Sequence, residues 1–287
     1  MQAPRPGVRF FKLSGGGNDF IAVLDTDFLT RDHATILCAH GHSLGADGVF
    51  SLELESESAE PTVRMTYRNA DGSRAGLCLN GTRCAALLAF HLGWAGERVT
   101  VATGAGKIRA HRSADGDMAL ELGAPEKPPV ASTVTVGGQK LRGWFIDTGV
   151  PHFVLEWSEN LLSAPVNEWG PEIRHSRRFE AGANVDFVRF VGRDRIEIRT
   201  FERGVEGETL ACGTGVLAAA AVAVHLDRAD LPLAALTSGG CVLAVGGHVA
   251  EDRSIADWTL AGDARLVAEG VLGAGALSIP EPPLWSD

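Results

Sequence analysis

The sequence predicts an α/β (α+β) protein of two pseudo-symmetric halves, each a mixed strand barrel or sheet wrapped around a central helix. Three observations lead to this fold class. The chain has 287 residues, which is enough for two domains at roughly 100–200 residues per domain. A segment of the first half recurs in the second half. In each half, short alternating runs typical of strands surround one small-residue, apolar run typical of a buried helix.

The composition is that of a globular protein and excludes several classes of function. Hydrophobic residues make up 45% of the chain and charged residues 22%, so there is enough apolar material to build a core. The formal net charge is -10. Because nucleic acids and anionic membranes attract basic surfaces, we expect neither as a partner.

The cysteines indicate a reducing compartment. There are five, and an odd number spread over the whole chain cannot all pair or form the disulfide framework of a small secreted protein. Residues 1–7 lack the apolar core of a signal peptide. The longest uncharged apolar stretch, Leu210 to Val224, falls short of the roughly 18 residues that a membrane-spanning helix needs. We therefore expect a cytoplasmic protein.

The internal repeat is the strongest signal in the sequence. Residues 64–78 align with residues 198–212 at an offset of 134 (212 − 78), so that Cys78 falls on Cys212. The match continues downstream, where Thr103-Gly-Ala-Gly-Lys and Thr237-Ser-Gly-Gly-Cys each lie 25 residues after the aligned cysteine (103 − 78 and 237 − 212).

The same relation continues upstream with a drifting offset. Gly45-Ala-Asp-Gly-Val-Phe resembles Gly182-Ala-Asn-Val-Asp-Phe, and Gly17-Asn-Asp-Phe falls on Gly149-Val-Pro-His. The sequence therefore reads as a duplicated unit.

Each half is expected to hold mostly strands and one central helix. The strand-like runs are Arg9–Leu24, Val63–Tyr67, Val99–Thr103 and Met118–Leu122, with counterparts at Trp144–Trp157, Val185–Phe190, Arg195–Phe201 and Val242–Val249. The predicted helices are Gly81–Leu92 and Gly213–Leu226, with a further one near Arg31–His40.

The proline-rich stretch Ala124–Pro129 is the natural boundary between the halves. We therefore assign residues 1–126 to an N-terminal half that carries Cys78, with a C-terminal strand at about 264–287 returning to it. Residues 127–263 form a C-terminal half that carries Cys212.

The two aligned cysteines share an unusual setting. Cys78 and Cys212 each stand at a glycine-containing turn that leads into a helix N-terminus. Such a position lowers the pKa of a thiol and presents free backbone N–H groups to an anion. Two such halves around one cleft would suit proton removal from one face of a carbon and proton delivery to the other face.

The motif series of the chain resembles that of the diaminopimelate epimerases, over residues from about 9 to about 272. The motifs that carry the resemblance, in order, are Gly15-Gly-Gly-Asn-Asp-Phe20, Gly45-Ala-Asp-Gly48, Asn69-Ala-Asp-Gly72, Cys78-Leu-Asn-Gly-Thr-Arg-Cys84, Gly182-Ala-Asn184, Glu202-Arg-Gly204 and Ala211-Cys-Gly-Thr-Gly215. The resemblance implies a cofactor-independent, two-base epimerase that interconverts LL- and meso-diaminopimelate in the synthesis of lysine and peptidoglycan precursors. It also implies an active site in the cleft between the halves.

The resemblance also assigns roles to individual residues. Cys78 and Cys212 are implied to be the catalytic thiolate and thiol pair. The side chains implied to bind substrate are those of Asn18, Asn69, Asn184, Glu202 and Arg203. The backbone segments Leu79-Asn80 and Gly213-Thr214 are expected to hold the reacting carboxylate, and His152 could orient the site.

Two positions depart from the family pattern. Leu79 stands where the family has glycine after the first catalytic cysteine, and Val150 stands where it has asparagine. Valine cannot make the two hydrogen bonds of an amide side chain. Two alternatives therefore stay open, namely a cofactor-independent racemase of another amino acid and a catalytically silent homologue that binds an amino acid.

No metal site is expected, because Cys38-Ala-His-Gly-His42 has no second ligand pair with zinc spacing. No cofactor is expected either. The expected partner is a small amino-acid substrate, and a homodimer is left open.

Overall fold

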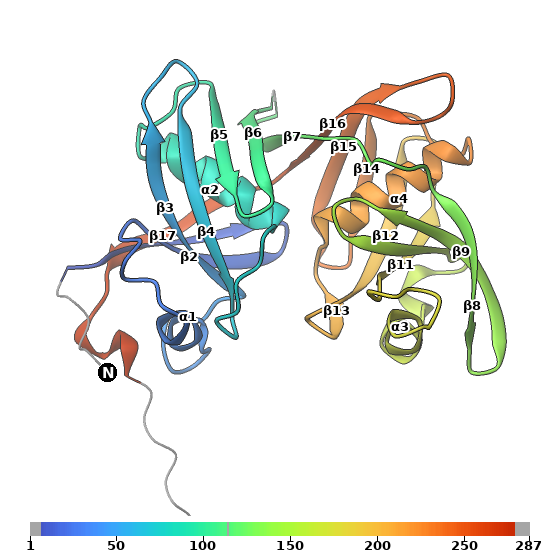
Figure 1. Cartoon of the computed structure of the whole chain (residues 1–287), viewed down its shortest axis with the longest axis horizontal. Helices are drawn as coiled ribbons and strands as arrows, with labels where there is room; N and C mark the ends of the chain where they lie inside the picture. The colour runs from blue at the N-terminus through green and yellow to red at the C-terminus, as the bar shows by residue number, and fades with distance from the viewer. Residues whose placement is uncertain (1–6, 114, 279–287) are drawn as a thin grey trace, which may run out of the picture. The chain divides into compact units, whose positions relative to one another are not determined.

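The computed structural model describes residues 7–113 and 115–278 and divides the chain into two compact units (Figure 1). Unit 1 contains the residues up to Ile108 together with those from Ala264 onward, and unit 2 contains Arg109–Asp263. Both units are dominated by β-strands and contain few helices, so the predicted α+β class with two related halves is confirmed.

The division lies earlier in the chain than the sequence predicts. Strand β7 (Met118–Leu122) pairs with β16 (Ile255–Gly262) and with the second part of β6 (Gly106–Arg112). Because β16 lies within unit 2, residues 109–126 belong to that unit rather than to the N-terminal half. Of the predicted C-terminal strand at about 264–287, residues 279–287 lie outside the described residues, and 265–271 form β17 in unit 1.

Unit 1 is a mixed sheet with strand order β17, β1, β2, β3, β4, β5. Two of these pairings are parallel, β2 with β3 and β4 with β5, and a helix connects the strands of each parallel pair. The elements are β1 (Arg9–Gly15), β2 (Asn18–Val23), α1 (Arg31–Cys38), β3 (Gly48–Ser56), β4 (Thr62–Asn69), α2 (Leu79–His91), β5 (Arg98–Thr103), β17 (Arg265–Val271) and the short helix η2 (Ala274–Leu277).

Unit 2 repeats this arrangement. Parallel pairs again bracket a helix, β10 with β11 around α3 and β12 with β14 around α4. The elements not yet given are β8 (Val130–Val136), β9 (Gln139–Asp147), β10 (Pro151–Glu156), η1 (Leu161–Ser163), α3 (Val166–Arg174), β11 (Asn184–Phe190), β12 (Arg195–Glu202), β13 (Gly207–Thr209), α4 (Gly213–His225), β14 (Leu233–Thr237) and β15 (Val242–Val249). Helix α3 was not among the predicted elements, because Pro171 and Gly170 in its middle mask its helical pattern.

The central helices of the two units match residue for residue. Helices α2 and α4 both have 13 residues, and both their first and last residues are 134 positions apart (213 − 79 and 225 − 91). Nearly every side chain of both helices is buried, which explains why most of their residues are small or apolar. In α2 the helix begins at Leu79, two residues before the predicted start, because Cys78 is its N-cap.

The backbone conformation also shows the duplication. Positive φ angles recur at the repeat offset of 134, at Gly72 and Glu206, at Gly93 and Asp227, and at Gly106 and Gly240. Since L side chains rarely adopt this conformation, the paired angles identify equivalent turns even where the residue has changed.

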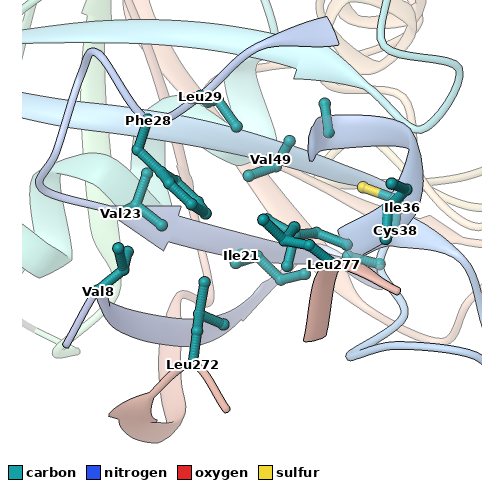
Figure 2. Packing of buried hydrophobic residues seen from close by; sticks show 13 residues of the cluster. Val8, Ile21, Val23, Phe28, Leu29, Ile36, Cys38, Val49, Leu272 and Leu277 are labelled. Carbon is teal, nitrogen blue, oxygen red and sulfur yellow. The ribbon is translucent and has the colours of Figure 1, made fainter. Parts of the chain in front are cut away.

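A hydrophobic cluster ties the C-terminal part of unit 1 to its N-terminal part (Figure 2). Ile21 and Val23 of β2, Leu37 of α1, and Leu272 and Leu277 beyond β17 are all buried in it. This packing covers one face of β2, and the N-terminal end of the same strand carries Asn18.

Among the described residues, none of the helices has the length and apolar character needed to span a bilayer.

Candidate active site

Cys78 lies at the point where the chain enters the buried helix of unit 1. It is the N-cap of α2, has an extended backbone, and its Sγ accepts a hydrogen bond from the Gly81 N–H at 3.4 Å. The thiol is partly exposed. The N–H groups of Leu79 and Asn80 belong to the first turn of α2, where amides lack carbonyl partners within the helix. The predicted combination of a thiol and an anion-binding helix end is therefore present at Cys78.

Two predicted substrate-binding residues bond to each other beside this thiol. The Asn80 Nδ2 donates to Asn18 Oδ1 at 2.7 Å, and Asn18 Nδ2 donates to Asp47 Oδ2 at 3.0 Å. The buried Arg83 guanidinium donates to Asn80 Oδ1 at 2.7 Å. These bonds fix the orientation of both amides and hold the start of β2 against the first turn of α2.

Tyr67 was not singled out from the sequence, although it is the only tyrosine of the chain. It lies in β4 beside Cys78, with which its hydroxyl makes a side-chain hydrogen bond. A Cβ at Gly48 would collide with the Tyr67 phenol, and Phe20 contacts the ring edge-on at 6.2 Å between centroids. The glycine that ends the Gly45–Gly48 motif therefore makes room for the ring.

Asn69 lies apart from this group of bonded side chains. It is exposed at the end of β4, where its Nδ2 donates to Ser73 Oγ at 3.0 Å within the turn that follows. Its role toward a substrate rests on the resemblance alone.

Cys212 occupies the equivalent N-cap of α4 in unit 2, but its surroundings differ from those of Cys78. Burial raises the pKa of this thiol well above its ordinary value of 9.0, and the neighbouring carboxylates of Glu202 and Asp186 raise it further. The Thr214 hydroxyl, 3.4 Å from Sγ, and the Gly215 N–H act in the opposite direction and are outweighed. The prediction of a lowered thiol pKa is therefore wrong for Cys212, because desolvation exceeds the effect of the helix end.

A buried polar chain leads from this thiol to Asp186. His152 Nε2 lies 3.0 Å from Thr214 Oγ1, and His152 Nδ1 lies 2.7 Å from Asp186 Oδ2, with both ionisable side chains completely buried. The Thr200 hydroxyl donates to the other oxygen of Asp186 at 2.8 Å. A Cβ at Gly215 would come within 2.5 Å of this carboxylate, which explains the second glycine of the Gly-Thr-Gly motif.

The hydrogen bonds of this chain determine the tautomer of His152. The Arg203 N–H donates to Asn184 Oδ1 at 2.7 Å, which turns Asn184 Nδ2 toward His152 Nε2 at 3.2 Å. Because Nδ2 can only donate, His152 Nε2 must accept, and the ring proton belongs on Nδ1 facing Asp186. Nε2 of His152 thus faces Asn184 and Thr214, and Nδ1 faces Asp186.

Glu202 ends β12 next to the thiol. Its carboxyl accepts hydrogen bonds from the Thr209 hydroxyl at 2.5 Å and from the Cys212 thiol. Burial raises the pKa of Glu202, and the two hydrogen bonds oppose that shift. The guanidinium of Arg203 donates to the Ala181 carbonyl at 3.0 Å, so it is anchored to the loop before β11.

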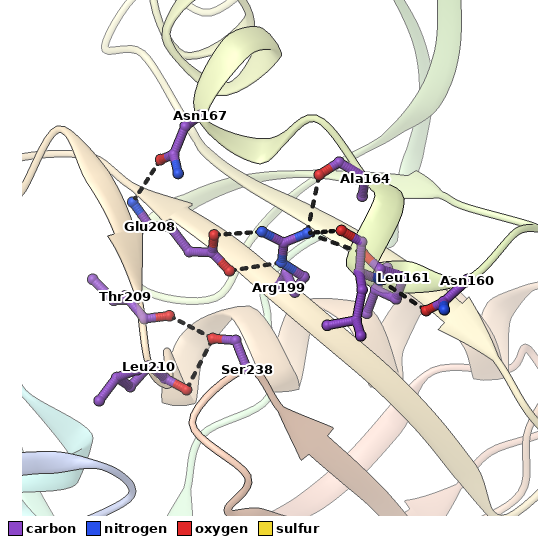
Figure 3. Close-up of polar contacts among 10 residues, drawn as sticks. Asn160, Leu161, Ala164, Asn167, Arg199, Glu208, Thr209, Leu210 and Ser238 are labelled. Atoms are coloured by element: carbon purple, nitrogen blue, oxygen red, sulfur yellow. Dashed lines mark hydrogen bonds and ion pairs between the residues drawn. The ribbon is translucent and has the colours of Figure 1, made fainter.

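The segment that leads into Cys212 is fastened at several points (Figure 3). Arg199 forms a bidentate ion pair with Glu208, at 2.7 and 2.6 Å, and also donates to the carbonyl groups of Leu161 and Ala164. The Ser238 hydroxyl donates to the carbonyls of residues 209 and 210. These contacts fasten the segment that carries Thr209, whose hydroxyl donates to Glu202.

The repeated motifs that begin at Thr103 and Thr237 make equivalent contacts in the two units. In unit 2 the Gly239 N–H donates to the Leu210 carbonyl, and at the equivalent place in unit 1 the Ala105 N–H donates to the Gly76 carbonyl. In each unit, the turn that follows the next strand after the helix therefore fastens the loop that precedes the aligned cysteine, Cys78 or Cys212.

The structure thus gathers the predicted residues into two groups, one in each unit. In unit 1 these are Asn18, Cys78, Leu79 and Asn80, and in unit 2 they are His152, Asn184, Glu202, Arg203, Cys212, Gly213 and Thr214. Within residues 7–113 and 115–278, no three His, Cys, Asp or Glu side chains are grouped so that they could hold a metal ion.

Sequence reasoning did not single out Tyr67, Asp186 or Thr209. For Tyr67 the available signal was that no other tyrosine occurs in the chain. For Asp186 it was a carboxylate flanked by Val185 and Phe187 in a strand, a residue type that is seldom fully buried without a partner.

The arrangement supports proton transfer to and from a weak carbon acid. Each unit presents a thiol beside the backbone N–H groups of a helix end, an arrangement suited to stabilising a carboxylate and negative charge that develops next to it. The polar groups of unit 2 add a buried carboxyl and an oriented imidazole.

Comparison with protein families identifies a matching family. The sequence model of the diaminopimelate epimerase family matches residues 10–128 and 144–252, which together cover most of both halves. Among curated proteins, the diaminopimelate epimerase of Methanothrix thermoacetophila is 41% identical over 249 residues, covering 81% of this chain and 87% of that protein. The diaminopimelate epimerase of Aquifex aeolicus is 38% identical over 252 residues, covering 83% of this chain and 89% of that protein.

Solved structures share the fold at low sequence identity. A phenazine biosynthesis protein of the PhzF family from Bacillus anthracis aligns with a TM-score of 0.67 at 17% identity, covering 92% of this chain and 98% of that one. A probable proline racemase from Agrobacterium radiobacter aligns with a TM-score of 0.67 at 14% identity, covering 93% of each chain.

Proposed function

The chain belongs to the diaminopimelate epimerase family, and from this premise we propose that it inverts one α-carbon of diaminopimelate, converting the LL isomer to the meso isomer and back. Such an enzyme is an isomerase that supplies meso-diaminopimelate for the synthesis of lysine and of peptidoglycan precursors. The observation that carries the proposal is the pair of cysteines at equivalent N-caps of two buried helices.

The proposed chemistry exchanges one proton for another. A thiolate removes the α-hydrogen, so that the C–H bond breaks, an S–H bond forms, and the electron pair stays on the α-carbon. The opposite thiol then gives its proton to the other face of that carbon, its S–H electron pair remains on sulfur, and the configuration is inverted. Inversion therefore requires Cys78 and Cys212 to reach the same α-carbon from opposite faces.

The helix ends make this reaction feasible. An α-hydrogen beside a carboxylate is very weakly acidic, because removing it adds negative charge next to a group that is already negative. The N–H groups at Leu79-Asn80 and Gly213-Thr214 are suited to hold that carboxylate and to stabilise the added charge. This stabilisation is largest where donors are fixed before the reaction begins, as the N-caps fix them here.

Other residues are proposed to bind the non-reacting parts of the substrate. The Arg203 guanidinium matches the geometry of a carboxylate, and Glu202 can accept a hydrogen bond from an ammonium group. Asn18, Asn69 and Asn184 complete the proposed set. Since Asn18 and Asn184 are already bonded to protein groups, we propose that they mainly orient their neighbours and offer their remaining hydrogen-bonding capacity to the substrate.

The test follows the α-hydrogen of LL-diaminopimelate by proton NMR in D₂O. Wild-type protein should both invert the centre and exchange its hydrogen for deuterium. Cys78→Ser and Cys212→Ser should each lose inversion by several orders of magnitude, since inversion needs both groups. If both serine variants kept full epimerisation, the two-thiol mechanism would be refuted.

Val150 gives a reason to include other substrates. It stands in the turn before β10 where the family has asparagine, so one distal hydrogen-bonding side chain is absent. A panel of monocarboxylic amino acids assayed beside diaminopimelate decides between an epimerase and a racemase of another amino acid. Binding without deuterium incorporation from any substrate would indicate a silent homologue, and light scattering tests for the homodimer.

A further inference from the structure

The two cysteines occupy equivalent places, yet the residues that surround them are chemically opposite. Strand register places Asp186 opposite Thr200 in unit 2, whereas Ser51 lies opposite Thr66 in unit 1. His152 falls on Phe20 in the repeat. Asp186 and His152, which lie near Cys212, thus have neutral counterparts in unit 1.

The hydrogen-bonding partners of the two thiols are opposite as well. Tyr67, at the repeat position of Phe201, makes a side-chain hydrogen bond to Cys78, whereas the Glu202 carboxyl beside Phe201 accepts one from Cys212. A phenol favours an anionic sulfur by donating to it, and a carboxylate favours a protonated sulfur by accepting from it.

Several contacts hold the Tyr67 hydroxyl where it can act. The ring lies over Gly48, where any side chain would displace it, and the edge contact with Phe20 limits its rotation. Phe20 also lies beside Gly81, whose N–H donates to the Cys78 sulfur. Tyr67 and Gly81 thus supply two donors to one sulfur atom, from β4 and from the first turn of α2.

On these contacts, and resting on the proposed function, we propose that Tyr67 is a positioning residue that holds Cys78 as the thiolate in the resting protein, while Cys212 rests as the thiol. The Tyr67 proton stays on the phenol oxygen throughout, so the residue donates a hydrogen bond and transfers no proton. The resting protein is then ready to accept the isomer whose α-hydrogen points at Cys78, with Cys212 as the proton donor.

The electrostatic surroundings in unit 1 agree with this assignment. Burial raises the pKa of Tyr67, and the adjacent Cys78 raises it further, so the phenol remains a donor at neutral pH. The titratable and charged groups that face this region from the neighbouring elements are Asp47, Cys38, Asp19, Lys12 and Arg83. The carboxylates of Asp47 and Asp19 are bonded to Asn18 and Lys12. The hydrogen bond that the Tyr67 phenol donates to sulfur therefore remains as the difference between the two units.

The test measures alkylation of Cys78 by iodoacetamide as a function of pH, with the modified peptide quantified by mass spectrometry. Tyr67→Phe keeps the ring that fills the space over Gly48 and removes only the hydroxyl. Loss of a hydrogen bond to an anion should raise the midpoint of the Cys78 titration by about one pH unit. Below both midpoints, a rise of about one pH unit in the midpoint lowers the thiolate fraction about tenfold. The remaining thiolate is about threefold more nucleophilic, so the alkylation rate should fall by only about threefold. The acid limb of the kcat/KM profile should move by the same unit.

Cys212 provides the internal control in the same digest. Its labelling should be much slower than that of Cys78 in the wild-type protein and should be unchanged by Tyr67→Phe. An unchanged Cys78 profile in a variant that melts at the wild-type temperature would overturn the proposal, and so would faster labelling of Cys212 than of Cys78.

A reciprocal measurement keeps the proposal testable if Tyr67→Phe fails to fold. As the only tyrosine, Tyr67 can be titrated by the near-ultraviolet absorbance of tyrosinate without interference from another phenol. Cys78→Ala should lower the midpoint of that titration, and an unchanged midpoint would contradict the hydrogen bond. Neither labelling nor absorbance uses a substrate, so these outcomes are independent of whether diaminopimelate is turned over.

Discussion

Replacing Asp186 by asparagine tests whether the buried chain of unit 2 depends on an acceptor that only a carboxylate supplies. In the wild-type protein both carboxylate oxygens accept hydrogen bonds, one from His152 at 2.7 Å and one from Thr200 at 2.8 Å. Asparagine has one acceptor oxygen and one donor nitrogen. If the oxygen keeps the Thr200 bond, the amide N–H₂ faces His152 Nδ1–H, and two donors meet. If the amide is turned, its oxygen accepts from His152 and its N–H₂ donates to the Thr200 oxygen, so the Thr200 hydroxyl proton loses its acceptor.

His152 cannot relieve this conflict by changing tautomer. Moving its proton to Nε2 lets Thr214 Oγ1 accept it at 3.0 Å, but Asn184 Nδ2, whose orientation is fixed by the Arg203 N–H, then loses its own acceptor. One buried donor is therefore left without an acceptor in either tautomer. Since a hydrogen bond to a charged group contributes about 1.5–3 kcal/mol and a buried unsatisfied donor costs about 1–3 kcal/mol, we expect unfolding of unit 2 to become easier by about 3 kcal/mol.

The assay is urea unfolding followed by tryptophan fluorescence, which reports mainly on unit 2 because Trp144, Trp157, Trp169 and Trp258 lie there. The matched control is Asp230→Asn, which changes an exposed carboxylate bonded to Arg193 and should leave the midpoint nearly unchanged. A loss below about 1 kcal/mol for Asp186→Asn would refute the argument, since it would mean that the site tolerates two facing donors.

Three further predictions concern a turn, a titration and an ion pair. Gly93 follows α2 at φ +71° with open space around it, so Gly93→Ala should cost about 1 kcal/mol from backbone strain alone, whereas Gly96→Ala, also in open space but without a positive φ, should be nearly neutral in thermal unfolding. Burial raises the pKa of Glu202 in the folded protein above its ordinary value of 4.5, so the stability that its bound proton contributes is complete below pH 4.5 and is lost as pH rises through the raised pKa. Glutamine cannot titrate, so between about pH 5 and pH 8 the unfolding free energy of Glu202→Gln should fall less than that of the wild-type protein. Equal losses in the two proteins would contradict the raised pKa. Arg199→Lys keeps the charge but cannot reproduce the bidentate pair with Glu208, so denaturant unfolding should show a loss of about 2 kcal/mol.

The features that depend on local sequence could be predicted. The helix starting after Cys212 was placed at its observed first residue, and the helix after Cys78 within two residues, because small apolar runs behind a glycine turn are a local signal.

The features that depend on tertiary neighbours could not be predicted. The pKa of Cys212 is decided by burial and by Glu202 and Asp186, which reach it from other strands, and the helix end alone gave the wrong direction. The unit boundary follows from β7 pairing with β16, which are more than 130 residues apart (255 − 118). No local pattern encodes such a pairing partner.

The discontinuity of unit 1 has a consequence for how the protein is made. Its strand β1 pairs with β17, about 250 residues later in the chain, and Leu272 and Leu277 complete its core. Unit 2, by contrast, is one continuous segment. The ribosome releases the chain from its N-terminus, so all of unit 2 is synthesised before β1 can pair with β17. Unit 1 is therefore begun first and completed last. Ribosome-bound chains that end at residue 263 and continue into a linker long enough to bring all of unit 2 outside the ribosome should consequently protect unit 2 from proteolysis, while β1, which lacks β17, stays more open to cleavage.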